Sequence, residues 1–179
     1  MINYSLGDLA GQKAGKYRSK IQYMLEDGGV QTKLEDLELE VENERIFELE
    51  VRPQDQKYTI EFRDLKPTEP PKKSEVVLEV KTNIGKPYQV TQNIAADLTN
   101  QEGKLIPGRY FTMYTESLDT RGKLNFNEKQ EVSKETSVLF VSDSQGSADK
   151  FKVIYELACP QEAGAGDYGT NVTYSLTEI

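Results

Sequence analysis

The sequence predicts an all-β protein: an immunoglobulin-like antiparallel β-sandwich of about seven to nine strands, preceded by an N-terminal strand or hairpin. Three observations predict this fold class. Apolar and polar residues alternate with a period of two in many short runs. Clusters of glycine, proline, asparagine and aspartate separate these runs. Few stretches between the runs have a helical period.

The strand-like runs follow one another along the whole chain. Each run places an apolar row on one side and a polar row on the other, because successive side chains of a strand point to opposite faces. The run 37–42 is rich in glutamate, a good helix former, but its strict alternation favours a strand. In order, the predicted strands lie at 17–25, 37–42, 47–52, 58–63, 76–81, 138–141, 151–157 and 168–176. The turn clusters lie at 27–29, 43–44, 53–55, 67–71, 83–87, 103, 107–108, 121–122 and 143–146.

The composition argues against several classes of function. The chain has 22 Lys and Arg against 30 Asp and Glu, so a basic surface for nucleic acid or an anionic membrane is not expected. It has no histidine, which excludes imidazole-based catalysis and histidine-bound metals, and its one cysteine excludes an internal disulfide. No apolar stretch approaches the ~20 residues of a membrane-spanning helix. We therefore expect a protein that is not an enzyme, uses no cofactor and does not insert into a membrane.

One segment of the sequence is repeated. Residues Ala14–Leu25 return 151 residues later as Ala165–Leu176, with five identical positions, two conservative exchanges and the same apolar phase. Two explanations remain open. Any Ala-Gly-x-Tyr turn before an alternating strand could look like this by convergence. Alternatively, the first copy is the closing strand of a preceding, related domain, since repeated units commonly stand in arrays.

The second explanation predicts how the chain is divided. Residues 1–34 would form an N-terminal strand or hairpin left from the preceding repeat, and residues 35–179 would form the sandwich. A strand without its parent sheet has unpaired backbone groups and an exposed apolar row. We therefore expect neighbouring copies of the chain, or related domains, as partners through strand pairing.

Four stretches, in this order, resemble a known family. The most distinctive are Gly85-Lys86-Pro87-Tyr88, after a strand that ends in Thr82-Asn83, and the closing Ala165-Gly166-Asp167-Tyr168. The order resembles the spore coat protein U-like domains and, more broadly, the immunoglobulin-like subunits of chaperone–usher pili. Such domains usually carry paired cysteines, whereas Lys81-Thr82 stand where one is often seen and Cys159 has no partner. The stretches are 58–65, 76–92, 138–155 and 165–174, within a resemblance that covers about residues 58–177.

The resemblance implies a non-catalytic structural or adhesive module of a bacterial surface or secreted protein. Such a module would be a fibre-like or pilus-like subunit that assembles through sheet edges. No functional residue carries over beyond the strand motifs. The alternative is a carbohydrate-binding module, because tyrosine rings can stack on sugars. Tyr110, Phe111 and Tyr114 are the best candidates for such a glycan site.

Three polar motifs have a plain structural interpretation beside a functional one. Asp143 and Asp149 flank a glycine and are weak candidates for calcium, but a calcium site needs about six to eight oxygen ligands. The alternative is a hairpin loop that joins strands 138–141 and 151–157. The segment Gly164–Gly169 fits G-x-G-x-x-G, but a strand follows it where a dinucleotide fold needs a helix. The alternating glutamates at 38–50 are interpreted as a solvated row of a strand rather than as a catalytic pair.

Overall fold

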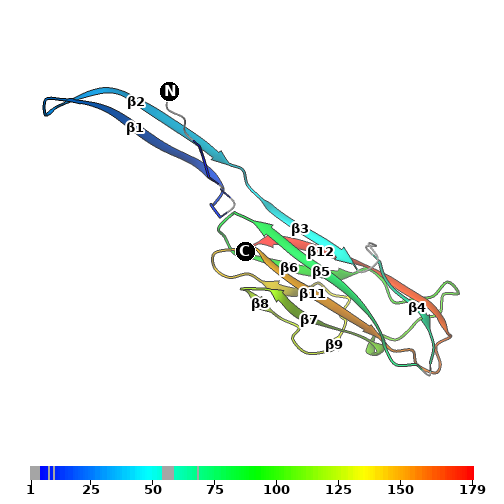
Figure 1. Cartoon of the computed structure of the whole chain (residues 1–179). Helices are drawn as coiled ribbons and strands as arrows, with labels where there is room; N and C mark the ends of the chain where they lie inside the picture. The colour runs from blue at the N-terminus through cyan, green and yellow to red at the C-terminus, as the bar shows by residue number, and fades with distance from the viewer. Residues whose placement is uncertain (1–4, 8, 10, 54–58, 68) are drawn as a thin grey trace.

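The structure of the chain, a computed structural model, describes residues 5–7, 9, 11–53, 59–67 and 69–179. It confirms the predicted all-β fold, with antiparallel sheets packed as a sandwich. Two five-stranded sheets form the sandwich, and a two-stranded hairpin projects from one end of it (Figure 1). No helix among the described residues is long and apolar enough to cross a membrane.

The strands form three antiparallel sheets. The hairpin consists of β1 (Gly15–Asp27) and β2 (Val30–Asn43). The first sheet has the order β3 (Phe47–Pro53), β5 (Lys72–Thr82), β11 (Asp149–Leu157), β7 (Phe111–Asp119) and β9 (Gln130–Glu131). The second sheet has the order β4 (Thr59–Leu65), β12 (Gly166–Glu178), β6 (Tyr88–Ile94), β10 (Ser137–Val141) and β8 (Lys123–Leu124). One short 3-10 helix, η1 (Gly108–Tyr110), precedes β7.

The sandwich has ten strands rather than the seven to nine expected, since two-residue strands such as β8 and β9 leave no alternation in the sequence. From β3 to β12, every connection passes from one sheet to the other. In an immunoglobulin domain, by contrast, several consecutive strands are neighbours in one sheet. The immunoglobulin strand order is therefore not observed, and the chain wraps around its core in the manner of a jelly roll.

The loop that carries Asp143 and Asp149 is not a hairpin loop, so that prediction is wrong. β10 pairs with β6 and β8 in the second sheet, whereas β11 pairs with β5 and β7 in the first. Alternation identifies each strand but does not determine which sheet it joins. The loop therefore carries the chain from one layer of the sandwich to the other.

The core lies between the two sheets and follows the predicted alternation. In β5, Val76, Leu78 and Val80 are buried, whereas the residues between them face outward. The rings of Phe140 and Phe151 stack across the sheets with centroids 5.1 Å apart. This apolar burial is the main contribution to stability that the structure displays.

A small polar network is buried inside this core. The Tyr155 hydroxyl donates to Gln92 Oε1 at 2.6 Å and lies 2.8 Å from the Tyr174 hydroxyl, and Gln92 Nε2 lies 2.8 Å from Met113 Sδ. Gln92 is only 1% exposed. Burial, together with the neighbouring Tyr174, raises the pKa of Tyr155 well above its usual value. Since β11 belongs to the first sheet and β6 to the second, the network ties the two layers together.

The hairpin joins the sandwich at Asn83, in the loop between β5 and β6. The Asn83 side chain donates to the Glu44 carbonyl at 2.8 Å and accepts from the Ile46 amide at 2.8 Å. Its backbone carbonyl accepts from the Ala14 amide at 2.9 Å. One residue therefore holds both strands of the hairpin at their base.

The division expected between residues 34 and 35 falls inside β2. β1 and β2 pair from Gly15 opposite Asn43 to Asp27 opposite Val30. The turn between them is Gly28-Gly29, with φ of +57° and +83°, as a tight hairpin turn requires. The hairpin is therefore a single structural unit that continues to Asn43.

Candidate functional site

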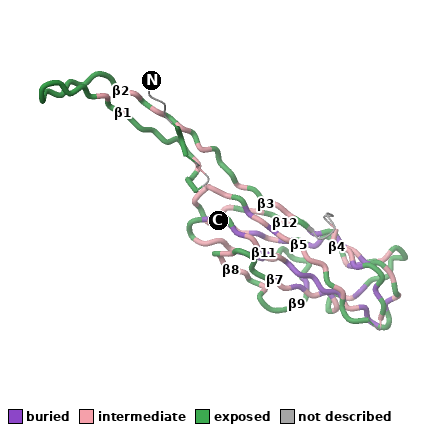
Figure 2. Tube along the Cα trace, viewed as in Figure 1, coloured by how far each residue is buried: buried purple, intermediate pink, exposed green. Residues whose placement is uncertain are grey.

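The hairpin is the most unusual feature of the molecule. Among the described elements, β1 packs extensively only against β2. Figure 2 shows the hairpin exposed or half-buried along its length, with the buried residues confined to the sandwich. Isolated two-stranded hairpins are marginally stable in water. A hairpin of this length that stands away from the body is therefore a candidate interaction site.

The register of the hairpin separates two chemically different faces. On one face, which we call the apolar face, cross-strand pairs such as Tyr17–Val41 and Ile21–Leu37 lie opposite each other. On the other, the charged face, bases of β1 lie opposite acids of β2. The apolar face consists of Tyr17, Ser19, Ile21, Tyr23, Leu37, Leu39 and Val41. The charged face consists of Lys16, Arg18, Lys20, Gln22, Asp36, Glu38, Glu40 and Glu42.

The charged face is held by cross-strand ion pairs. Arg18 Nε lies 2.7 Å from Glu40 Oε2, and Lys16 lies 3.6 Å from Glu42. Asp36 is contacted by two cations, Lys20 and Lys33, each with Nζ at 2.6 Å from Oδ2. These pairs are exposed and each contributes little to stability, but together they fix which side of the ribbon faces water.

The hydrogen bonds from Lys20 and Lys33 lower the pKa of Asp36 below its usual value. A carboxylate with a lowered folded-state pKa contributes stability above its unfolded pKa, and this contribution is lost as the pH falls through the folded value. We therefore expect the Asp36 ion pairs to survive to a pH below the usual aspartate range. An NMR titration of the Asp36 carboxyl carbon measures this, and Lys20→Gln with Lys33→Gln should raise its midpoint. An unchanged midpoint in that variant would contradict the assignment.

The apolar face is covered only near its base. There, Leu6 and Leu9 of the N-terminal segment lie over Tyr17, Leu39 and Val41 and enclose a mainly apolar cavity of about 340 Å³. Further toward the tip, around Ile21 and Leu37, no described strand other than the hairpin's own two packs extensively on this face. Exposed contiguous apolar surface of this kind marks interaction sites in soluble proteins.

The tip of the hairpin adds further apolar surface. Met24, Leu25, Val30 and Leu34 are all at least half exposed. Leu34 is the extra residue of a β-bulge, because Tyr23 pairs with Glu35 and Met24 with Lys33. A bulge increases the local twist and redirects a side chain, and here it leaves a leucine outside the regular pairing. The apolar surface therefore extends from the uncovered part of the ribbon to its end.

The repeated segment adopts the same local structure in both places. β1 and β12 are each 13 residues long and begin at the corresponding glycines, Gly15 and Gly166, with φ of +150° and +149°. In β12 the repeated row is turned into the sandwich, where Tyr168, Thr170 and Val172 are buried. In β1 the corresponding row is Tyr17, Ser19, Ile21, Tyr23 and Leu25, on the apolar side of the hairpin. The repeated side chains that are buried in the core in β12 therefore have mostly exposed counterparts in β1.

The calcium candidates are engaged by the protein itself. Asp143 Oδ1 accepts from the amides of Gln145 and Ser147, and its Oδ2 accepts from the Ser147 hydroxyl at 2.7 Å. The hydrogen bonds from Ser147 lower the Asp143 pKa. Asp149 is buried and accepts from the Tyr88 hydroxyl and the Arg121 amide. The described residues contain no group of three or more acidic, histidine or cysteine residues that could hold a metal ion.

The three aromatic candidates for a glycan site do not form one platform. Phe111 is buried in the core, where it stacks on Tyr155 at a centroid distance of 5.8 Å. Tyr114 lies half-buried on the outer face of the first sheet, where its hydroxyl accepts from Lys73 at 3.2 Å. Tyr110 belongs to η1, with the Arg109 guanidinium 4.8 Å from its ring centroid. These three residues were predicted to form one site only because they are close along the chain.

Cys159 and the G-x-G-x-x-G segment have structural roles. Cys159 is a buried free cysteine, and burial raises its pKa, which disfavours the reactive thiolate. The glycine segment leads into β12, a strand, as predicted.

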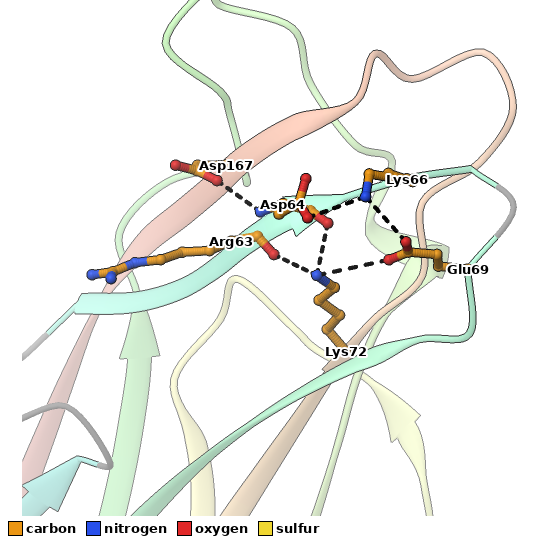
Figure 3. A network of polar contacts seen from close by, with 6 residues as sticks. All are labelled: Arg63, Asp64, Lys66, Glu69, Lys72 and Asp167. Carbon is orange, nitrogen blue, oxygen red and sulfur yellow. Dashed lines mark hydrogen bonds and ion pairs between the residues drawn. The ribbon is translucent and has the colours of Figure 1, made fainter.

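A charged cluster at the end of β4 is also structural (Figure 3). Asp64 has φ of +49°, and its amide donates to Asp167 Oδ1 at 2.8 Å. Lys72 Nζ donates to the carbonyls of Arg63 and Asp64, both at 2.7 Å, and Glu69 lies close to Lys72 and Lys66. The register between β4 and β12 shifts at this point. The cluster therefore stabilises a bulge, and its charges neutralise one another.

The division of the hairpin into an apolar face and a charged face was not predicted from the sequence. Glu38, Glu40 and Glu42 were interpreted as a solvated row and were not paired with Lys16, Arg18 and Lys20. The signal was present, since three bases alternate in the first run and four acids alternate in the second. Recognising it required the register, which only the pairing of β1 with β2 supplies.

Comparison with protein-family models, with curated proteins and with solved structures gives no match. The class of protein that the structure defines is therefore an antiparallel β-sandwich with a projecting hairpin.

Proposed function

We propose that the chain is a non-catalytic structural or adhesive module that assembles with further copies of itself through the hairpin. The observation that carries this proposal is the apolar face, where Ile21 and Leu37 are only half-buried and no described element outside the hairpin packs extensively on β1. A two-stranded ribbon with such a face gains stability when a partner buries it. The resemblance to spore coat protein U-like and pilin-type domains suggests that the module works on a cell surface or outside the cell.

The choice of a second copy rests on the repeat. The apolar row of β1 has the same pattern as the row of β12, which is buried in this protein's own core. A surface made of such rows suits burial against sheets of the same composition. The partner is therefore another chain of this kind rather than an unrelated protein.

The edges of the hairpin favour one arrangement of the copies. The basic row lies on β1 and the acidic row on β2. When β1 of one copy pairs antiparallel with β2 of the next, opposite charges lie side by side, whereas β1 with β1 places bases together. Such a head-to-tail contact produces a ring or an open fibre. This arrangement agrees with the fibre-like role that the resemblance implies.

The test compares two double variants of the full chain. Ile21→Thr with Leu37→Thr changes the apolar face, and Gln22→Thr with Glu38→Thr changes the charged face at neighbouring positions. Threonine is a good strand former, so both variants should keep the hairpin. Burial of Ile and Leu contributes about 1.5–3 kcal/mol each, so the first variant should weaken association by about tenfold or more.

Light scattering over a concentration series measures the association of both variants and the wild type. We expect a wild-type mass that rises above the monomer, a loss of this rise in the apolar-face variant and only a small reduction in the charged-face variant, which removes one of the four acids of the β2 row. A wild type that stays monomeric at all concentrations, or equal losses in the two variants, would refute the proposal.

A further inference from the structure

A cavity lies where the hairpin meets the sandwich, and we call it the junction cavity. It has a volume of about 330 Å³. Four separate segments line it: residues 11–13 ahead of β1, residues 82, 83 and 85 at the end of β5 and just after it, Arg121 in the turn after β7, and residues 145–148 in the loop before β11. The cavity therefore has one wall from the base of the hairpin and the others from loops at one end of the sandwich.

The charge of this cavity is opposite to that of the chain. Its lining includes two cations, Lys13 and Arg121, and no aspartate or glutamate, although the protein as a whole carries a net charge of -8. Among the lysines and arginines that the structure describes, only Lys13, Arg121 and Lys123 have no ion pair. Two of these three cations line the same cavity. Every other lysine and arginine that the structure describes, except Lys123, has a carboxylate partner, so these two cations have no counter-ion among the described side chains.

The backbones of both residues are fixed beside the cavity, and the Lys13 side chain also has a close neighbour. The side chain of Lys13 lies across Gly85, so closely that a Cβ at Gly85 would come within 2.6 Å of Lys13 Cε. The Lys13 carbonyl accepts from the Tyr17 hydroxyl at 2.6 Å and from Asn43 Nδ2 at 3.2 Å. The Arg121 amide donates to Asp149 Oδ1 at 2.5 Å, which fixes the backbone of that turn.

The two carboxylates at the ends of the neighbouring loop form no ion pair with these cations. Asp149 is buried behind the wall, where its two oxygens accept from the Arg121 amide and the Tyr88 hydroxyl. Asp143 is engaged by the amides and hydroxyl of its own loop. Neither residue lines the cavity. The guanidinium of Arg121 and the ammonium of Lys13 therefore remain available to a ligand.

We propose that the junction cavity binds a tetrahedral oxyanion, a phosphate or sulfate group. A guanidinium presents a fork of donors that fits two oxygens of such a group, and a lysine adds a point charge, so together they match a dianion. The volume is at the lower end of ligand pockets and leaves space for a small group attached to the anion. A bound oxyanion would bridge Lys13, at the base of the hairpin, to Arg121, on the sandwich, and would hold the two parts together.

The test titrates inorganic phosphate, and separately sulfate, into the full-length protein at constant ionic strength set with chloride. Amide NMR signals of Gly85, Arg121 and Gln145 should shift and saturate together for both anions. Lys13→Gln and Arg121→Gln should each weaken the binding by about tenfold or more, because a hydrogen bond to a charged group contributes about 1.5–3 kcal/mol. Lys123→Gln is the matched control, since it removes the third cation without an ion pair from outside the cavity, and binding should be unchanged.

Three results would overturn the proposal. The first is a shift that grows linearly without saturation. The second is a loss of binding in Lys123→Gln as large as in Lys13→Gln and Arg121→Gln. The third is acetate binding as tightly as phosphate, which would show that the cavity does not select a tetrahedral dianion. The readout is the binding of a small anion, so it gives an answer whether or not the hairpin assembles as proposed above.

Discussion

Replacement of Gly146 by alanine is expected to destabilise the protein by about 3 kcal/mol or more. Gly146 has φ of +61°, in the left-handed region that side chains disfavour. An added Cβ would lie 1.8 Å from the carbonyl oxygen of Lys86, so the backbone of one loop must move. For a protein of this size, the melting temperature should fall by about 6–12 °C, which a thermal melt measures.

Gly103→Ala separates the two causes of this loss. Gly103 also has a positive φ, of +76°, but no atom lies within 4 Å of an added Cβ. Gly103→Ala should therefore lower the free energy of unfolding only by the cost of the left-handed backbone conformation, about 1–2 kcal/mol. Equal losses at Gly146 and Gly103 would mean that the contact between the two loops contributes nothing.

The buried network around Tyr155 gives the second large expected effect. Tyr155→Phe removes the hydroxyl that donates to Gln92 Oε1 and contacts the Tyr174 hydroxyl. Gln92 is buried, so its carbonyl would be left without a partner, at a cost of about 1–3 kcal/mol in the free energy of unfolding. Chemical denaturation of the variant measures this cost.

A double-mutant cycle tests whether these residues act as a unit. Gln92→Leu alone removes the acceptor for Tyr155, and Tyr155→Phe alone leaves Gln92 unsatisfied. The double variant contains neither unpaired group, so it should lose less than the sum of the two single losses, with a coupling of about 1 kcal/mol. Additive losses would show that the hydrogen bond between the layers contributes little.

The individual strands could be predicted from the sequence because a period of two is a local property. The run 151–157 corresponds to β11, and the run 168–176 lies within β12. Strands of two residues, such as β8 and β9, have no period and could not be found. Two longer strands, β6 (Tyr88–Ile94) and β7 (Phe111–Asp119), were also not among the predicted runs, although their burial alternates.

The order of the strands could not be predicted, because it depends on contacts between distant residues. Strands 138–141 and 151–157 are close along the chain, which favours a hairpin, yet they belong to opposite sheets. The loop between them is held by Asp143 and by Gly146, which packs against Lys86 of another loop. A contact of this kind leaves no local pattern in the sequence.

The candidate sites, like the strands, could be predicted only where the pattern is local in the sequence. An exposed N-terminal strand with an apolar row was predicted from the repeat at Ala14–Leu25 and corresponds to β1. The junction cavity was not predicted, since Lys13, Gly85 and Arg121 are widely separated in the sequence. The aromatic residues at 110–114 do not form one cluster, because Phe111 and Tyr114 lie on opposite sides of β7 and Tyr110 belongs to η1.

Hydrogen exchange of the full chain at two protein concentrations measures directly whether the hairpins of different copies assemble. No described strand besides β1 and β2 belongs to the hairpin's sheet, so the backbone amides along its two outer edges can pair with the next copy when hairpins assemble. We expect the protection of these edge amides to rise with concentration, whereas the protection of β5 and β11 stays constant. Protection in the hairpin that does not change over a hundredfold range of concentration would contradict this expectation.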